Sequence, residues 1–230
     1  MIEIIATTID EAKCIESSGA ERIELISALS EGGLTPSYGL IESVVKAVKI
    51  PVNVIIRPHS KSFEYTKSEI EMMITDIAVA KKLGANGVVI GGLSHKKISI
   101  NSLEKLLEKS FNMDVTFHRA FDELEDMVSG VKILSNYNEI TSVLTSGGPG
   151  CIRENCSKIN ELLKHSGHIN VLVGGGLTLE NFQEISKKTN AHSFHFGSAV
   201  RHHNSYREGI DESKIKEIIR IKENLALQYI

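Results

Sequence analysis

An imidazole, a guanidinium and a carboxylate lie within five residues of one another, at His118, Arg119 and Asp122. They follow a short run in which apolar and polar residues alternate, with Val115 and Phe117 on one face. This alternation predicts a buried strand over 114–119, with the His118 imidazole on the opposite face. Such a histidine can act as a general acid or base, or it can be a hydrogen-bonded core residue. The polar residues at the ends of the other predicted strands decide between these two interpretations.

Other predicted strands also carry polar residues on the face that would line the inside of a barrel. A period of two along each strand places inward Glu3, Glu24, Asn53, Arg57, Thr116, His118 and His195. Charged side chains are rarely buried unless they are paired. A purely structural network of ion pairs is one explanation, and a functional pocket at the strand ends is the other. The cost of burying such a set, compared with an aliphatic interior, favours the pocket.

Short apolar runs alternate with amphipathic segments along the whole chain. The predicted strands lie at 2–6, 21–27, 52–57, 87–92, 114–119, 142–147, 170–175 and 193–198. The predicted helices between them lie at 8–18, 36–48, 67–83, 101–110, 123–136, 153–165 and 178–188. Capping-box spacing occurs at Thr66 with Glu69 and at Asn101 with Glu104, and Thr35-Pro36 has the form of an N-cap before a first-turn proline.

Strict alternation of strand and helix predicts parallel strands, and eight such units predict a closed barrel. The fold class is therefore α/β, a single (β/α)8 TIM barrel with a C-terminal helical tail. We expect one domain over residues 1–230, with the barrel core at about 2–200 and a tail helix within 201–230. The amphipathic segment at 211–230 is either the eighth barrel helix or an added one.

Small and hydroxyl residues follow the predicted strands 6, 7 and 8. These residues are Thr145, Ser146, Gly174, Gly175, Gly176, Gly197 and Ser198. In barrels of this kind the site lies at the C-terminal strand ends, and the loops after strands 7 and 8 often hold a phosphate. We expect the glycine-containing loop at 30–37 to fold over the same mouth.

These residues predict a pocket for a small anionic ligand, phosphorylated substrates included. Arg57 and Arg119 would bind the anion through paired hydrogen bonds. His118 would be the general acid or base, with Glu24 as its partner across the barrel. Asn53, His195 and the small residues after strands 6 to 8 would complete the binding set. The corresponding hypothesis is a metal-independent isomerase or lyase, and an inactive barrel that serves as a scaffold is the alternative.

Asp122 has two interpretations of its own. It could orient Arg119 or His118 as part of the site. Its spacing to Glu125 also fits a capping box, which would give it a local structural role.

The charge and composition of the chain limit the kinds of binding partner that we expect. The formal net charge is −3 over 230 residues, so no basic surface indicates nucleic acid or an anionic membrane. The N-terminal residues run directly into a strand pattern, without the charged and apolar regions of an export signal, so we expect a cytoplasmic protein. The three cysteines lie in helical patterns, which suits a reducing compartment.

Several motifs taken together resemble one family. Residues 22–25 with 31–37, Arg57-Pro58, 116–122, 144–148 and 174–176 resemble, in this order, the CutC family of copper homeostasis proteins. The resemblance spans about residues 2 to 200. It implies a cytoplasmic (β/α)8 barrel that is often a homo-oligomer, and it implies Cu(I) as a ligand.

The chain departs from that family where copper binding is concerned. Members proposed to bind Cu(I) tend to carry cysteines at the inward ends of strands 1 and 2, where this sequence has Ile5 and Ile26. Cu(I) prefers thiolate and thioether ligands. Cys151 and Cys156 are five residues apart, so a helix turns them to different faces, and Cys14 lies mid-helix. The residues alone therefore predict no metal site and no cofactor, and Cu(I) rests on the resemblance.

Overall fold

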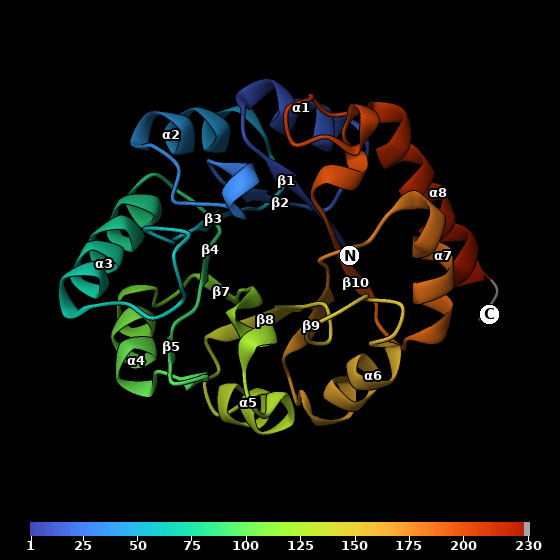
Figure 1. Ribbon diagram of the computed structural model, residues 1–230. Coiled ribbons are helices and arrows are strands. Elements are labelled where there is room, and N and C mark those ends of the chain that lie inside the picture. Colours follow the sequence, from blue (N-terminus) through green and yellow to red (C-terminus); the bar gives the residue numbers. More distant parts are fainter. Residues whose placement is uncertain (228–230) are drawn as a thin grey trace.

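Eight parallel strands form a closed barrel in the computed structural model, which describes residues 1–227 (Figure 1). Around the barrel the strand order is β1-β10-β9-β8-β7-β4-β3-β2. The strands are β1 (Ile2–Ala6), β2 (Arg22–Leu25), β3 (Val52–Ile55), β4 (Gly87–Ile90), β7 (Asp114–Phe117), β8 (Ile140–Thr145), β9 (Asn170–Val173) and β10 (Ser193–Phe196). The predicted (β/α)8 barrel is confirmed.

Helices surround the barrel and follow the strands in alternation (Figure 1). They are α1 (Ile9–Ser17), α2 (Tyr38–Ala47), α3 (Lys67–Lys82), α4 (Ile100–Lys109), α5 (Met127–Leu134), α6 (Cys156–His165), α7 (Leu179–Lys188) and α8 (Glu212–Leu227). Helix α8 contacts both α7 and α1, so the C-terminal segment is the eighth barrel helix. The last three residues of the predicted tail, 228–230, lie outside the described residues. Within the described part of the chain, no helix is both long and apolar enough to cross a membrane.

The two faces of the strands carry different cores, because successive side chains along a strand point in opposite directions. Outward-facing aliphatic residues such as Ile4 and Leu25 pack under the helices in the large core. Inside the barrel a separate small cluster contains Ile5, Ile26 and Ile55, together with Val89. The predicted inward positions of Ile5 and Ile26 are therefore confirmed.

Strand β8 begins and ends two residues before the predicted 142–147. Gly147 has φ +81°, a left-handed backbone that ends the extended run. Helix α5 also begins later than predicted, because residues 119–123 form a separate 3₁₀ turn.

One of the predicted helix starts is confirmed and two are wrong. Thr66 and Glu69 form a reciprocal capping box. Helix α4 instead begins after Ser99, whose hydroxyl lies 2.9 Å from that of Ser102, so Asn101 is no cap. Helix α2 is capped by Ser37, two residues beyond the predicted Thr35.

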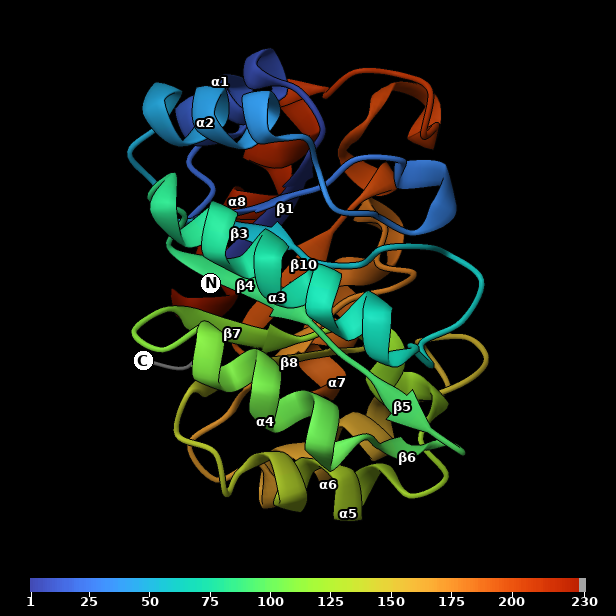
Figure 2. The ribbon, with the colours of Figure 1, turned by 90° about the vertical axis from the view of Figure 1, so that its left-hand side faces the viewer.

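A short hairpin after β4 was not predicted. Its strands are β5 (Leu93–Ser94) and β6 (Lys97–Ile98), and Figure 2 shows it beyond the end of β4. His95 and Lys96 both have positive φ, of 50° and 57°, as a two-residue hairpin turn requires. Asn and Gly are the usual signals for such a turn, and neither occurs here.

Candidate functional site

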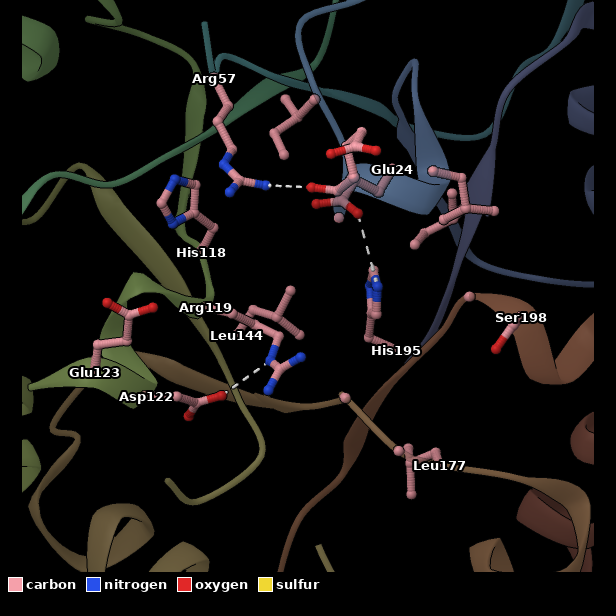
Figure 3. Close-up of a pocket in the computed structure, with 18 of the residues that line it drawn as sticks. Glu24, Arg57, His118, Arg119, Asp122, Glu123, Leu144, Leu177, His195 and Ser198 are labelled. Atoms are coloured by element: carbon pink, nitrogen blue, oxygen red, sulfur yellow. Dashed lines mark hydrogen bonds and ion pairs between the residues drawn. The ribbon is translucent and has the colours of Figure 1, made fainter. Parts of the chain in front are cut away.

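A cavity of about 620 Å³ opens at the C-terminal ends of the strands (Figure 3). The predicted site residues that line it are Glu24, Arg57, His118, Arg119, Asp122, Gly175, Gly176, His195, Gly197 and Ser198. They come from five of the eight barrel strands or the loops that follow them. The fold thus brings together side chains that are up to 174 residues apart.

Four other predicted binding residues lie outside the cavity lining: Asn53, Thr145, Ser146 and Gly174. The Asn53 Oδ1 atom accepts a hydrogen bond of 3.1 Å from Asn86, deeper in the barrel. Thr145 and Ser146 contact Asp122 instead of the cavity. Gly174 packs beside His195, where an added Cβ would lie 2.9 Å from the His195 Cβ. These four residues therefore contact neighbouring residues of the barrel and do not line the cavity.

Arg57 is a buried cation on one wall of the cavity. Its Nη1 atom donates to the carbonyl oxygens of Glu31 and Gly33, at 3.1 and 3.2 Å. The guanidinium carbon lies 4.7 Å from the centroid of the Phe63 ring. Its Nε has no partner, and among residues 1–227 the guanidinium forms no ion pair with a carboxylate. A buried charge of this kind is costly without a counter-ion, so this wall favours an anion.

His118 is held as a neutral imidazole. Its Nδ1 accepts a hydrogen bond of 3.2 Å from the backbone N–H of Ala120, so in the neutral ring Nε2 carries the proton. Burial and then the positive charge of Arg57 lower the pKa of His118 to about 3. The ring lies 4.9 Å from that of Phe63, and Nε2 is buried without a partner among residues 1–227. At neutral pH His118 is therefore an unpaired hydrogen-bond donor.

A chain of buried ionisable groups crosses the floor of the cavity from β2 through β1 to β10. Arg22 Nε lies 2.5 Å from Glu3 Oε2, and Glu3 Oε1 lies 2.7 Å from His195 Nδ1. His195 Nε2 then lies 3.7 Å from Glu24 Oε2. Strand register produces the chain, because Glu3 is aligned with both Arg22 and His195.

The ionisable groups in this row have shifted pKa values. Burial raises the pKa of Glu24 to about 7; the charge of His195 opposes the rise and that of Glu3 adds to it. Burial opposes a charged His195, but the carboxylates of Glu24 and Glu3 outweigh it and raise its pKa. Burial would raise the pKa of Glu3 as well, yet Arg22 and His195 hold it below its usual range. Glu24 and His195 thus form a pair that can hold or release a proton near neutral pH.

Asp122 orients Arg119, which confirms one of the two sequence interpretations. Arg119 Nε donates to Asp122 Oδ2 at 2.9 Å, and its Nη2 lies 3.3 Å from Ser146 Oγ. Asp122 also accepts hydrogen bonds from the Ser146 hydroxyl at 2.9 Å and from the Thr145 hydroxyl. The capping box with Glu125 is wrong, because the helix that follows is capped by Asp126.

Gly175 leaves the space that Arg119 occupies. A Cβ there would lie 2.6 Å from the Arg119 guanidinium carbon, and the glycine has φ +80°. The glycine run after β9 therefore has at least one direct structural reason, in addition to its place on the cavity lining.

Sequence reasoning missed other lining residues, among them Phe63, Leu144 and Tyr206. Phe63 and Tyr206 lie in irregular segments, where no periodicity indicates direction. The loop at 30–37 was expected over the mouth, and Glu31 and Gly32 do line the cavity. Arg22 was also missed, although the period of two places it on the same strand face as Glu24.

The donor atoms at the site do not suit a soft metal ion. The cavity lining contains no cysteine or methionine, and Ile5 and Ile26 belong to the apolar interior cluster. Cys14 is half-buried, Cys151 is exposed and Cys156 is buried, each away from the lining. Within residues 1–227 there is no group of three or more His, Cys, Asp or Glu residues placed to hold a metal. This set does not fit a resident Cu(I) ion with thiolate or thioether ligands.

Comparison with known proteins decides the family. The model of the CutC family matches residues 1–200. The chain belongs to the CutC family. A human copper homeostasis protein cutC homolog is 39% identical over 197 residues, which cover 85% of this chain and 72% of that protein. A CutC family protein of Pasteurella multocida is 37% identical over 196 residues, covering 84% and 80%.

The fold of the family is also that of this chain. A CutC crystal structure from Streptococcus agalactiae superposes with a TM-score of 0.80 at 30% identity, over 86% of this chain and 97% of that one. The resemblance drawn from the motifs of the CutC family is thereby confirmed for both family and fold.

Proposed function

We propose that the cavity of this CutC family member binds a small anion and carries out metal-independent acid–base chemistry on it, of the isomerase or lyase type. The observation that carries the proposal is the buried guanidinium of Arg57, which faces the cavity without a carboxylate partner among the described residues. An anionic ligand would supply the missing counter-charge.

Three further features support the proposal. Arg119, held by Asp122, offers a second guanidinium at the cavity wall. Glu24, with a pKa of about 7, suits a general acid or base that works near neutral pH. The cavity volume of about 620 Å³ is within the range of small-molecule sites.

Anion binding is the first measurement. We would titrate sulfate, whose charge stays constant between pH 5 and 9, into the protein and into Arg57→Met by calorimetry. We expect the substitution to weaken sulfate binding by about tenfold or more, because a charged hydrogen bond and a full charge are lost. Arg153→Met is the matched control, since Arg153 is a surface arginine paired with Glu184 outside the cavity. Equal affinities for all three proteins would contradict the proposal and favour an inactive scaffold.

Copper handling is a second candidate, and the names of the relatives favour it. The human relative is called a copper homeostasis protein. We would titrate the reduced protein anaerobically with Cu(I) against a competing chelator, beside a variant with Cys14, Cys151 and Cys156 replaced by serine. Because the lining has no thiolate or thioether, we expect the chelator to keep the metal. Stoichiometric binding that outcompetes the chelator would make copper the leading account.

The location, the oligomeric state and the partners of the protein are further proposals. We propose a cytoplasmic homo-oligomer that has no nucleic-acid or membrane partner. Cell fractionation would test the location, and sedimentation of the purified protein would test the assembly.

A further inference from the structure

We propose, building on the proposed function, that the substrate is an anionic carbonyl compound with an acidic hydrogen on the carbon next to the carbonyl. In this assignment Glu24 moves that proton, while neutral His118 donates a hydrogen bond to the carbonyl oxygen. The two residues would thus divide the work, instead of acting as two proton carriers.

The hydrogen bonds of His118 fix this role. The lone pair on Nδ1 is already used by the N–H of Ala120, at 3.2 Å, so the ring cannot accept a proton there without losing that bond. His118 is one of the residues that line the cavity, and its buried Nε2 atom has no hydrogen-bond partner among residues 1–227. A donor of this kind is satisfied by an oxygen acceptor, and it stabilises most an oxygen on which negative charge develops.

Neighbouring groups hold the donor in place and add positive charge beside it. Phe63 packs against both groups, with its ring centroid 4.7 Å from the guanidinium carbon of Arg57 and 4.9 Å from the His118 ring centroid. Gly91 lies against the imidazole, where an added Cβ would be 2.4 Å from Cε1. Arg57 and His118 therefore share one wall, so a substrate whose anionic group pairs with Arg57 would present a nearby oxygen to His118.

Glu24 lines the same cavity from β2, the strand beside the one that leads to Arg57 (Figure 3). Beside it the lining is aliphatic, from Ile5 and Ile55. A carboxylate next to an apolar surface suits a proton taken from carbon, because few other polar groups compete for it. His195, 3.7 Å away, supplies a compensating charge when Glu24 is ionised.

The step needs no further reactant. The Glu24 carboxylate takes the proton, and the electron pair of that C–H bond forms a carbon–carbon double bond. The carbonyl π pair moves to oxygen, where the N–H of His118 meets the new negative charge. Where the carbon that loses the proton carries a hydroxyl group, the hydroxyl proton passes to the oxygen at His118, and Glu24 returns its proton to the former carbonyl carbon. The electron pair of the C=C bond forms the new C–H bond, and the carbonyl re-forms at the carbon that carried the hydroxyl, so the isomerisation needs no oxidation or reduction.

Oxalate is the probe that tests this assignment, because it is a planar dianion with the shape of the enolate of a 2-oxo acid. Sulfate is the tetrahedral comparison. We expect His118→Phe to weaken oxalate binding about tenfold or more and sulfate binding much less. His118→Gln, which keeps an N–H donor, should stay within about threefold of the parent for oxalate. Equal losses for both anions, or no loss, would overturn the role of His118.

A spectroscopic measurement on the unaltered protein covers the case in which the Phe variant does not fold. In ¹⁵N-edited spectra of the imidazoles, His118 should show a protonated Nε2 and an unprotonated Nδ1, unchanged from pH 5 to pH 8. Titration of this ring within that range, or the opposite tautomer, would overturn the assignment.

The role of Glu24 has its own readout. An enolate-like ligand matches the state in which Glu24 holds the proton, so oxalate affinity should fall about tenfold per pH unit above pH 7. In Glu24→Gln the affinity should be nearly constant, and sulfate should depend on pH far less in both proteins. Parallel pH dependence of oxalate and sulfate would overturn this inference yet leave anion binding intact, whereas failure of the parent protein to bind either anion would overturn the proposed function as well.

Discussion

Buried charged residues of this barrel fall into two groups. Glu3 is paired on both sides, by Arg22 and His195. Arg57 and Glu24 are not compensated in this way: Arg57 has no ion pair among the described residues, and the nearest cation to Glu24 is 3.7 Å away. The paired group explains how the barrel tolerates charge, and the two less compensated residues, Arg57 and Glu24, both line the cavity.

Stability should depend on pH through Glu24. Its pKa rises from 4.5 to about 7 on folding, so its contribution is fully present below about pH 4.5 and is lost as the pH rises toward 7. Glu24→Gln cannot ionise, so we expect the fall in unfolding free energy between pH 5 and pH 8 to shrink by about 1–3 kcal/mol. Urea unfolding at the two pH values measures this change.

The control for this experiment is Glu123→Gln. Glu123 also lines the cavity, but its side chain is exposed at the rim. We expect the stability of this variant to follow the parent protein at both pH values. A pH dependence in Glu24→Gln as steep as that of the parent would show that another group is responsible.

The packing around the His118 ring can be tested by substitutions at two adjacent glycines. A methyl group at Gly91 would lie 2.4 Å from His118 Cε1, whereas one at Gly92 would meet only a Tyr65 ring atom, at 3.8 Å. We expect Gly91→Ala to lower the unfolding free energy by about 1–3 kcal/mol and to weaken oxalate binding, because the ring must move. Gly92→Ala should change both much less. Thermal unfolding and calorimetry compare the pair, and equal effects would mean that the His118 ring is not tightly seated.

At the scale of elements, the 3₁₀ turn at Arg119–Glu123 is fixed to the end of β8 by one carboxylate. Asp122 accepts from Arg119, Thr145 and Ser146, and these contacts aim Arg119 at the cavity. Asp122→Asn places an amide donor against these donors, so we expect a loss of about 1–3 kcal/mol in stability and weaker sulfate binding. Arg119 is half exposed, which limits its share of the loss.

Glu125→Gln is the matched control, because Glu125 would be the partner of Asp122 in the rejected capping box. Its side chain is exposed, and the substitution should leave urea unfolding unchanged within about 0.5 kcal/mol. If Glu125→Gln destabilises the protein as much as Asp122→Asn, the local cap would be the better account of Asp122.

The strands could be predicted from the sequence because their signal is local. A period of two placed Glu24, His118 and His195 on the inner face, and the cavity lining contains all of them. The hairpin at Leu93–Ile98 gave no such signal, since its turn residues are His95 and Lys96. Asn101 has the spacing of a cap, yet the fold starts its helix earlier, after Ser99.

The partners within the site could not be predicted, because they depend on alignment between distant strands. Glu3 meets Arg22 and His195 only because β1 lies between β2 and β10 in the closed barrel. Likewise, Asp122 has one spacing that fits a cap and another that fits Arg119. Only the position of Thr145 at the end of β8, with Ser146 directly after it, decides between them.

For the molecule as a whole, the last part of the chain is tied to the first. Strand β10 pairs with β1, α8 contacts α1, and Arg201 joins the two segments. Arg201 is 2% exposed; its Nη1 and Nη2 atoms donate to the Glu11 carboxylate at 2.5 and 2.9 Å. Burial would raise the pKa of Glu11, but Arg201 and Thr7 hold it below its usual value, so the stability that this pair contributes is lost only in acid.

Arg201→Met should therefore weaken the contact between the first and last parts of the barrel. It leaves the Glu11 carboxylate without its buried cation, and we expect a loss of about 3–5 kcal/mol in unfolding free energy at pH 7. Adding Glu11→Gln removes the stranded charge, so the double variant should recover part of this loss, and a double-mutant cycle by urea unfolding gives the coupling. Losses that simply add would mean that the two ends of the chain are held by strand pairing and helix packing alone. Strong coupling would instead show that this single ion pair, 190 residues apart in the sequence, helps to close the barrel on which the cavity is built.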